Sequence, residues 1–219
     1  MSTRTPARSS ARFALITTAV VLVALAAIVI ALIATRPQAA PDPTEPLLTS
    51  DTHLLGEQGG AIELVEFGDF ECPACAAFEP YLHELRAEYA DEVTFAFRHL
   101  PLPQHPHALD AAHAVEAAAR QGRFTEMHDA LYAGQPEWAG LADAAPVFRS
   151  YAEQLGLDLT QYDADVASDE VHAAVQADAD AATRLGVRGT PTFFLEGKML
   201  ELTSFDDLRA AVEGAIDAR

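Results

Sequence analysis

The sequence predicts an α/β fold in which a βαβ unit is followed by a helical block and then by a ββα unit. Apolar runs with strand character occur at 62–67, 93–97 and 192–195, at the two ends of the folded part of the chain. Between them, apolar residues recur at helical spacing almost throughout 107–186. The order of these patterns is that of a sheet interrupted by a helical insertion, and one uncharged segment, 13–34, precedes them all.

The uncharged segment 13–34 is expected to be a single transmembrane helix. As an α-helix it would be about 33 Å long, enough to cross a hydrocarbon core of roughly 30 Å. Arg4, Arg8 and Arg12 precede it, so the positive-inside rule predicts that residues 1–12 are cytoplasmic and that everything beyond the helix is extracytoplasmic. The alternative is a cleaved signal peptide, but its apolar core usually has only about 7–15 residues. The length therefore favours a retained signal-anchor in the cell membrane.

Residues 35–58 are predicted to be a linker, because four prolines stand among small and polar residues without periodicity. The folded domain is expected over 59–219, with the helical insertion at about 104–186. The chain has 14 Lys and Arg against 33 Asp and Glu, a formal net charge of −19. Such an acidic surface repels phosphate backbones, so nucleic-acid binding is not expected.

The strands and the last helix have local signals of their own. The run 62–67 is apolar on both faces apart from two acids, as in a central strand covered by helices. The run 93–97 should pair with it in parallel if the helix between them is a crossover. A turn at Glu196-Gly197-Lys198 predicts a hairpin with 199–202, and Ser204 is a candidate N-cap for the final helix.

Cys72 and Cys75 are the only cysteines, and they lie where the first strand passes into a helix. Two intervening residues on a first helical turn place both sulfurs on one face, where they can form a disulfide or a dithiol without refolding. The positive end of the helix favours the Cys72 thiolate, and Pro73 suits the first helical position. A structural zinc site would need more ligands, and a structural disulfide this short would contribute little, so redox chemistry is the favoured interpretation.

The element order and several motifs resemble the DsbA family of extracytoplasmic thiol–disulfide oxidoreductases, which have a thioredoxin fold with a helical insertion. The motifs are Glu-Phe-Gly-Asp-Phe-Glu-Cys-Pro-Ala-Cys at 66–75, Phe-Arg-His-Leu-Pro-Leu at 97–102, Gln-Gly-Arg-Phe at 121–124 and Gly-Val-Arg-Gly-Thr-Pro-Thr-Phe at 186–193. The resemblance extends over 53–219. It implies a redox-active Cys72–Cys75 disulfide, with no other cofactor and no metal.

The resemblance also assigns roles to individual residues. Pro191 aligns with the family's cis-proline, which faces the disulfide, and Thr190 would present its backbone to an extended substrate peptide. Pro73 and Ala74, between the cysteines, are expected to contact the substrate as well. Glu66 aligns with a buried carboxylate beneath the active site, and it shares a strand face with apolar residues by period-2 alternation. Such a carboxyl can exchange protons with the deeper thiol, Cys75.

One departure concerns the strength of oxidation. Strongly oxidising members have a histidine where this chain has Ala74, and Asp69 and Glu71 flank the site. Nearby anions oppose a thiolate, so Cys72 is expected to be less acidic than in those members.

The expected function is that of a membrane-anchored disulfide oxidase acting on the cysteine thiols of exported proteins, reoxidised by a quinone-linked membrane oxidase. The same site run in reverse would be a reductase or isomerase, and a tethered peptide-binding or chaperone module with an idle CxxC is a further alternative. Two other groups of residues are assigned no site: the histidines of 99–113, which prolines interrupt, and the aromatic residues around Trp138, which are expected to be core.

Overall fold

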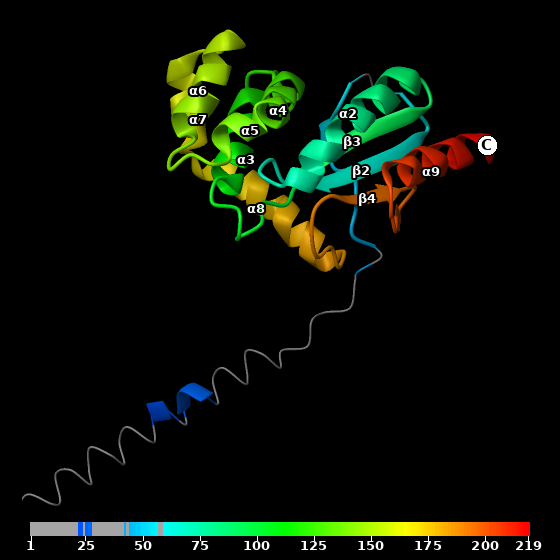
Figure 1. The fold of residues 1–219 in the computed structure, drawn as a ribbon, viewed down its shortest axis with the longest axis horizontal. Coiled ribbons are helices and arrows are strands. Elements are labelled where there is room, and N and C mark those ends of the chain that lie inside the picture. Colours follow the sequence, from blue (N-terminus) through cyan, green and yellow to red (C-terminus); the bar gives the residue numbers. More distant parts are fainter. Residues whose placement is uncertain (1–21, 24, 28–41, 43, 57–58) are drawn as a thin grey trace, which may run out of the picture. The chain divides into compact units, whose positions relative to one another are not determined.

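The computed structural model describes residues 22–23, 25–27, 42, 44–56 and 59–219. Pro41–Arg219 forms one compact unit, which contains the sheet and the helices around it (Figure 1). In the described part of the chain, no helix is both long enough and apolar enough to cross a membrane. The cytoplasmic segment and most of the membrane helix expected over 13–34 lie outside the described residues, so both stay predictions.

Within the described residues the centre of the domain is a five-stranded mixed sheet of order β1-β3-β2-β4-β5. The strands are β1 His53–Leu54, β2 Ile62–Gly68, β3 Val93–His99, β4 Thr192–Leu195 and β5 Lys198–Met199. The two central strands β2 and β3 are parallel, whereas β4 pairs antiparallel with both β2 and β5. This confirms the predicted βαβ and ββα units and brings the two ends of the domain sequence together in one sheet.

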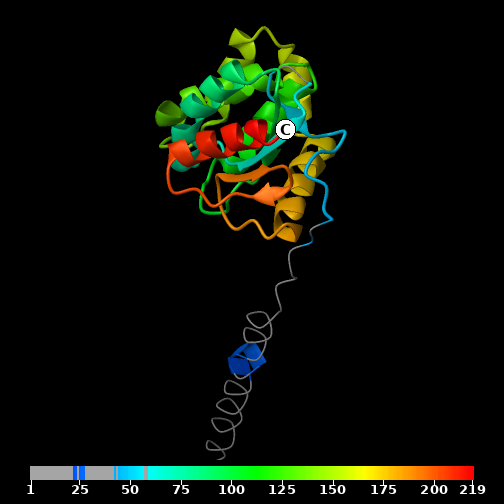
Figure 2. The ribbon, with the colours of Figure 1, turned by 90° about the vertical axis from the view of Figure 1, so that its right-hand side faces the viewer.

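Helices cover both faces of the sheet. Helix α2, Pro73–Glu88, and helix α9, Phe205–Asp217, pack on the face that carries Ile62 and Leu64. Helix α8, Asp169–Arg184, lies on the opposite face (Figure 2). Its Ala182 belongs to the apolar cluster that includes Val65 and Phe67. Covering on both sides explains why β2 is apolar on both faces.

The helical insertion separates β3 from β4, as expected. Its helices are α3 Ala108–Ala119, α4 Phe124–Ala133, α5 Gln135–Trp138, α6 Ala145–Gln154, α7 Leu159–Val166 and α8. Trp138 is fully buried among them, packs edge-on against Phe148 with ring centroids 5.0 Å apart, and donates its indole N–H to the Leu131 carbonyl at 2.9 Å. The expectation that these aromatic residues form core is confirmed.

The linker expected over 35–58 is wrong in its second half. Residues 53–54 form β1, which pairs antiparallel with β3, and Leu47 and Leu55 are buried. The guanidinium of Arg98 also donates to the carbonyl of Pro46 at 3.0 Å. Without this segment, β3 would present an edge of unpaired N–H and C=O groups, and β1 supplies their hydrogen-bond partners. The proline-rich composition of the segment gives no sign of this pairing.

The C-terminal hairpin differs slightly from its expected bounds, because β5 ends at Met199 rather than continuing to residue 202. Its turn residues Glu196 and Gly197 both have positive φ, 49° and 79°, as a two-residue hairpin turn with the twist of the strands requires. Ser204 caps α9 as predicted: its hydroxyl accepts the N–H of Asp207, whose carboxylate accepts the N–H of Ser204 in return.

Candidate active site

The two cysteines lie at the start of α2, at the carboxyl end of the central strand β2. Cys72 is the N-cap residue of α2 and Pro73 follows at the first helical position. The N–H of Cys72 donates to the carbonyl of Asp69 at 3.0 Å, closing the turn that leads out of the strand. Both thiols are free in this structure, with Cys72 6% and Cys75 1% exposed. The predicted strand–turn–helix arrangement is therefore present.

The surroundings of Cys72 favour its thiolate. A hydrogen bond from the Cys75 side chain lowers the pKa of Cys72 to about 5; burial opposes this, while Thr190 and the backbone N–H groups of Cys75 and Ala74 support it. The Cys72 thiol donates to the Thr190 carbonyl at 3.4 Å. The Thr190 hydroxyl is buried and has no hydrogen-bond partner while Cys72 is a neutral thiol. The hydroxyl can therefore donate to the Cys72 thiolate once it forms. At neutral pH, Cys72 is therefore in its nucleophilic form.

Cys75 lies in the opposite environment. Burial raises the pKa of the Cys75 thiol far above its ordinary value, and its hydrogen bond to Cys72 and the nearby Glu66 act in the same direction. The two sulfurs of one motif therefore differ strongly in acidity, with the thiolate on the outer cysteine.

Glu66 lies beneath the cysteines on β2, on the face that packs against α2. The side chain is buried, and neither carboxyl oxygen has a hydrogen-bond partner in the described protein. Burial raises the pKa of Glu66 well above its ordinary value; Glu79 adds to this, and Arg86, which is paired with Glu79 at 2.5 Å, opposes it. The raised pKa favours the protonated form of Glu66, which can exchange a proton with Cys75.

The Thr190–Pro191 loop faces the cysteines across the active site. The peptide bond between these residues is cis, as expected for Pro191. Beside Pro191 lies a groove of about 400 Å³ whose lining includes Phe78, Met199 and Leu200. Between the cysteines, Pro73 and Ala74 are exposed at the helix start. The structure thus places all four residues expected to contact substrate beside Cys72 or along the adjoining loop.

The flanking acids do not act on Cys72 as expected. The Asp69 carboxylate accepts the backbone N–H groups of Glu71 and Leu102, at 2.8 and 2.9 Å, and contacts His105 Nδ1 at 2.6 Å. The Glu71 carboxylate accepts the N–H of His107 at 2.5 Å. Both side chains are buried and serve the backbone of neighbouring loops, and neither is among the main influences on the pKa of Cys72.

Gln135 is a part of the site that the sequence did not indicate. From the short helix α5 its amide nitrogen donates to the carbonyls of Phe70 and Cys72, at 2.7 and 3.0 Å. These bonds tie the cysteine turn to the helical insertion across more than sixty positions of sequence. Local periodicity carries no signal for a contact at that separation.

The histidines of the 99–113 segment do not meet in the structure. His99 contacts Glu116, His105 contacts Asp69, and His107 lies 2.8 Å from the carbonyl oxygen of Leu141. His113 instead lies beside the ring of a histidine from α8, with centroids 4.6 Å apart. Each of these histidines therefore has a different partner.

Solved structures share this architecture. A thioredoxin-like oxidoreductase from Silicibacter pomeroyi is 27% identical, with a TM-score of 0.65 over 83% of this chain and 100% of that one. BdbD from Bacillus subtilis, 20% identical, gives a TM-score of 0.67 over 75% of this chain and 92% of its own. The thiol–disulfide exchange protein α-DsbA2 from Wolbachia pipientis, 17% identical, also gives 0.67, over 77% and 89%. The last two likenesses establish the fold.

Sequence relatives include much longer proteins. Na⁺/H⁺ antiporter NhaA 3 from Salinispora tropica is 44% identical over 147 residues, which are 67% of this chain and 22% of the antiporter. NhaA 1 from Mycolicibacterium gilvum is 41% identical over 151 residues, 67% of this chain and 23% of its own. The chain thus spans less than a quarter of these relatives. The family model described as thioredoxin matches residues 48–214, most of the chain, and the chain therefore belongs to the thioredoxin family.

Proposed function

We propose that this protein is an extracytoplasmic thiol–disulfide oxidoreductase that introduces disulfides into exported proteins. The observation that carries the proposal is the asymmetry of the CxxC pair: Cys72 has a lowered pKa beside the Thr190 carbonyl, and Cys75 is buried near the carboxyl of Glu66, whose pKa is raised. The sulfur of Cys72 can react with a client while that of Cys75 stays buried, which is the arrangement that disulfide exchange requires.

The reaction starts from the Cys72–Cys75 disulfide. A client thiolate attacks the Cys72 sulfur, the S–S bond breaks, and the electron pair leaves on Cys75. Glu66, whose protonated form is favoured by burial, supplies the proton that Cys75 takes up. A second client thiolate then attacks the client sulfur of the mixed disulfide, and Cys72 leaves as a thiolate. Two electrons pass from the client to the enzyme, and the client gains one disulfide.

Client binding uses the Thr190–Pro191 loop. An extended peptide can pair with the exposed backbone of such a loop and place its cysteine at the sulfur of Cys72. The apolar groove of about 400 Å³ beside Pro191 suits hydrophobic side chains of an unfolded client. These contacts involve mainly main-chain and apolar groups, so we expect broad substrate selection.

The low pKa of Cys72 favours oxidation of clients over reduction. Stabilising the thiolate stabilises the dithiol form, and a stable dithiol makes the disulfide a stronger oxidant. The chain has no further cysteine to act as a relay, so reoxidation needs a partner, and the DsbA resemblance implies a quinone-linked membrane oxidase. We place the protein in the cell membrane through 13–34, with its domain outside. Ion transport is not proposed, since the chain matches 22% of the antiporter's length.

The redox state of the pair in cells tests this function. Thiol alkylation with a mass-shifting reagent should show Cys72 and Cys75 mostly as a disulfide, and the Cys75→Ala variant should accumulate mixed disulfides with exported proteins. A dithiol pair in cells would instead indicate a reductase. If Cys75→Ala trapped no client and Cys72→Ala had no phenotype, the protein would be a non-catalytic binding module.

A further inference from the structure

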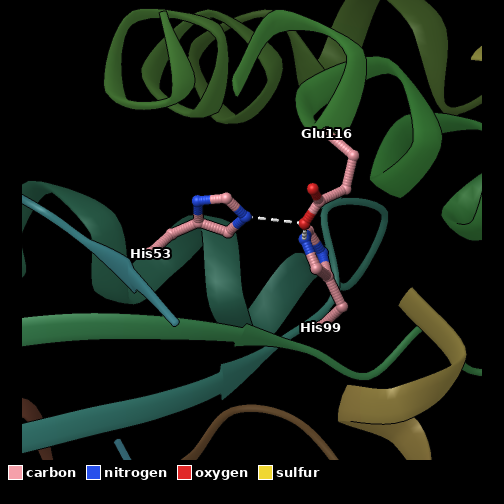
Figure 3. A group of neighbouring side chains, drawn as sticks. All are labelled: His53, His99 and Glu116. Carbon is pink, nitrogen blue, oxygen red and sulfur yellow. Dashed lines mark hydrogen bonds and ion pairs between the residues drawn. The ribbon is translucent and has the colours of Figure 1, made fainter. Parts of the chain in front are cut away.

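A second cluster of reactive side chains lies at the edge of the sheet, apart from the cysteines. His53 comes from β1, His99 from the end of β3 and Glu116 from α3 (Figure 3). Both imidazole Nε2 atoms contact the same oxygen, Glu116 Oε1, at 2.7 and 2.8 Å. Elements far apart in sequence thus bring two nitrogen ligands and one carboxylate within 4.8 Å of one another.

The charge of the cluster suits a cation. Burial opposes ionisation of Glu116, but hydrogen bonds from His53 and His99 outweigh it and hold the pKa of Glu116 well below its usual range. Among the described residues, the ion-pair partners of this carboxylate are those two histidines, with no arginine or lysine. Two further titratable groups lie close to the cluster: His113, and the carboxylate of Asp178, which accepts the backbone N–H of His99 at 2.9 Å. The cluster therefore combines one carboxylate with two imidazole nitrogens, and no cationic side chain among the described residues pairs with that carboxylate.

The donor set matches the preferences of Zn²⁺. Two imidazole nitrogens and one carboxylate oxygen, with a water as the fourth ligand, form a common tetrahedral zinc site. Bond lengths of about 2.0–2.2 Å would separate each nitrogen from the oxygen by roughly 3.3 Å, about half an ångström more than here. His53 can supply that movement, because its side chain is 20% exposed and belongs to a two-residue edge strand.

A second group of possible ligands provides a contrast. Glu79, His128 and Asp129 also lie within reach of one another. There the guanidinium of Arg86 already contacts Glu79 at 2.5 Å and Asp129 at 3.5 Å. A fixed positive charge thus occupies the place that a cation would take, whereas the cluster of His53, His99 and Glu116 has no such competitor among the described residues.

We propose that His53, His99 and Glu116 form a zinc site that fastens β1 to the edge of the domain. Binding moves the proton of each imidazole from Nε2 to Nδ1, so that both Nε2 lone pairs reach the ion. His99 Nδ1 is buried and has no acceptor in the described protein. Because a missing second-shell partner weakens metal binding about 10–100-fold, we expect an affinity lower by that factor than in a zinc site whose histidines all have such partners.

Equilibrium dialysis of the full-length protein in detergent against Zn²⁺ tests the proposal, with Cys72 and Cys75 held as a disulfide so that thiolates do not bind the ion. We expect one equivalent of Zn²⁺. Glu116→Gln and His53→Gln should each weaken binding at least about tenfold. His83→Gln, at an exposed histidine of α2, and Asp129→Asn, in the second group, should bind as the unaltered protein does.

Cobalt gives a second readout. Co²⁺ in the same site should show the intense visible bands of four-coordinate cobalt, and these bands should disappear in Glu116→Gln. Thermal unfolding without metal identifies any variant that fails to fold. His53→Gln is the variant whose folding should be least affected, because His53 is partly exposed on an edge strand. Unchanged Zn²⁺ affinity in both site variants, loss of binding in Asp129→Asn, or no binding at millimolar Zn²⁺ would each overturn the proposal.

Discussion

The start of α2 and the interior beneath it shift the pKa values of two chemically identical thiols in opposite directions. At the helix start, hydrogen bonds lower the pKa of Cys72 to about 5. A turn deeper, burial and Glu66 raise the pKa of Cys75. Hydrogen bonding to the charged form governs one site and desolvation governs the other. The comparison teaches that the backbone position of each sulfur, more than the CxxC spacing, decides which one meets the client.

Removing either sulfur should produce the largest effects. Cys72→Ser should slow exchange with a peptide disulfide by at least about a thousandfold, since a hydroxyl is not ionised at neutral pH. Cys75→Ala should still react once and then stop at the mixed disulfide, because no resolving thiol remains. Rapid mixing followed by acid quench and mass spectrometry separates these outcomes. If both variants formed the mixed disulfide at equal rates, the assignment of Cys72 as the attacking thiol and Cys75 as the resolving thiol would be wrong.

The pH profile of alkylation should sharpen the comparison. For the reduced protein, the iodoacetamide reactivity of Cys72 should be level above about pH 7 and fall about tenfold per pH unit below its midpoint near pH 5. Cys75 should remain unreactive to at least pH 9, because its pKa is raised. A midpoint near that of an ordinary thiol, about 8.5, would contradict the assigned environment of Cys72.

The same asymmetry makes the stability of the reduced protein depend on pH. The pKa of Cys72 is lower in the folded chain, about 5, than in an unfolded chain, about 8.5. Its stabilising contribution is therefore complete above about pH 8.5 and is lost as the pH falls to about 5. Urea unfolding across this range should show a rise in stability with pH that Cys72→Ser lacks. Parallel curves for the two proteins would be the contrary result.

Thr190→Val tests the hydroxyl that faces Cys72. The change keeps the shape of the side chain and removes one donor to the thiolate, so the pKa of Cys72 should rise by about one unit. At pH 5 this lowers the reactive fraction several-fold, while at pH 8 the rate should hardly change. Thr183→Val, at an exposed threonine of α8, is the matched control. An identical midpoint in both variants would exclude the Thr190 hydroxyl as an influence.

Glu66→Leu should have the smallest effect, on stability. Both carboxyl oxygens are buried without partners, and the raised pKa of Glu66 means that it destabilises the fold above the unfolded value of about 4.3. Replacement should raise the free energy of unfolding by roughly 1–3 kcal/mol at pH 7.5 and by less at pH 4, where only the cost of the unpartnered oxygens remains. Glu63→Leu, at the exposed residue of the same strand, should show no such pH dependence. A pH-independent gain in both variants would refute the titration of Glu66.

Glu66→Gln separates the proton-transfer role of this residue from its cost to stability. If Glu66 exchanges a proton with Cys75, the amide should alter the pH dependence of exchange while the first attack on Cys72 continues. An unchanged pH dependence would show that the carboxyl takes no part in the reaction.

Local pattern was sufficient for much of this fold. Alternation along 62–67 predicted that Glu66 is buried on the face of its apolar neighbours, and the CxxC at a strand end predicted the start of α2. The cis bond before Pro191 followed from the family resemblance. Each of these features depends on residues that are close in sequence or on a motif with a fixed place in the fold.

Contacts between distant segments were not predictable in this way. Pairing of His53 with the edge of β3 and the reach of Gln135 to Phe70 join positions that no periodicity relates. The Asp69 carboxylate accepts the N–H of Leu102 in another loop and, contrary to expectation, is not among the main influences on the pKa of Cys72. Hydrogen bonds of this kind depend on how helices and strands pack against one another, and local sequence periodicity does not predict that packing.

Transfer of one disulfide to a client tests the central claim most directly. Full-length protein with the Cys72–Cys75 disulfide would be mixed with an equimolar, reduced, unfolded client that has two cysteines, and both redox states followed by alkylation. The account predicts that the client becomes oxidised while Cys72 and Cys75 become a dithiol in equal amount, with no transfer from Cys72→Ser. A client that stays reduced, with the enzyme disulfide intact, would contradict it.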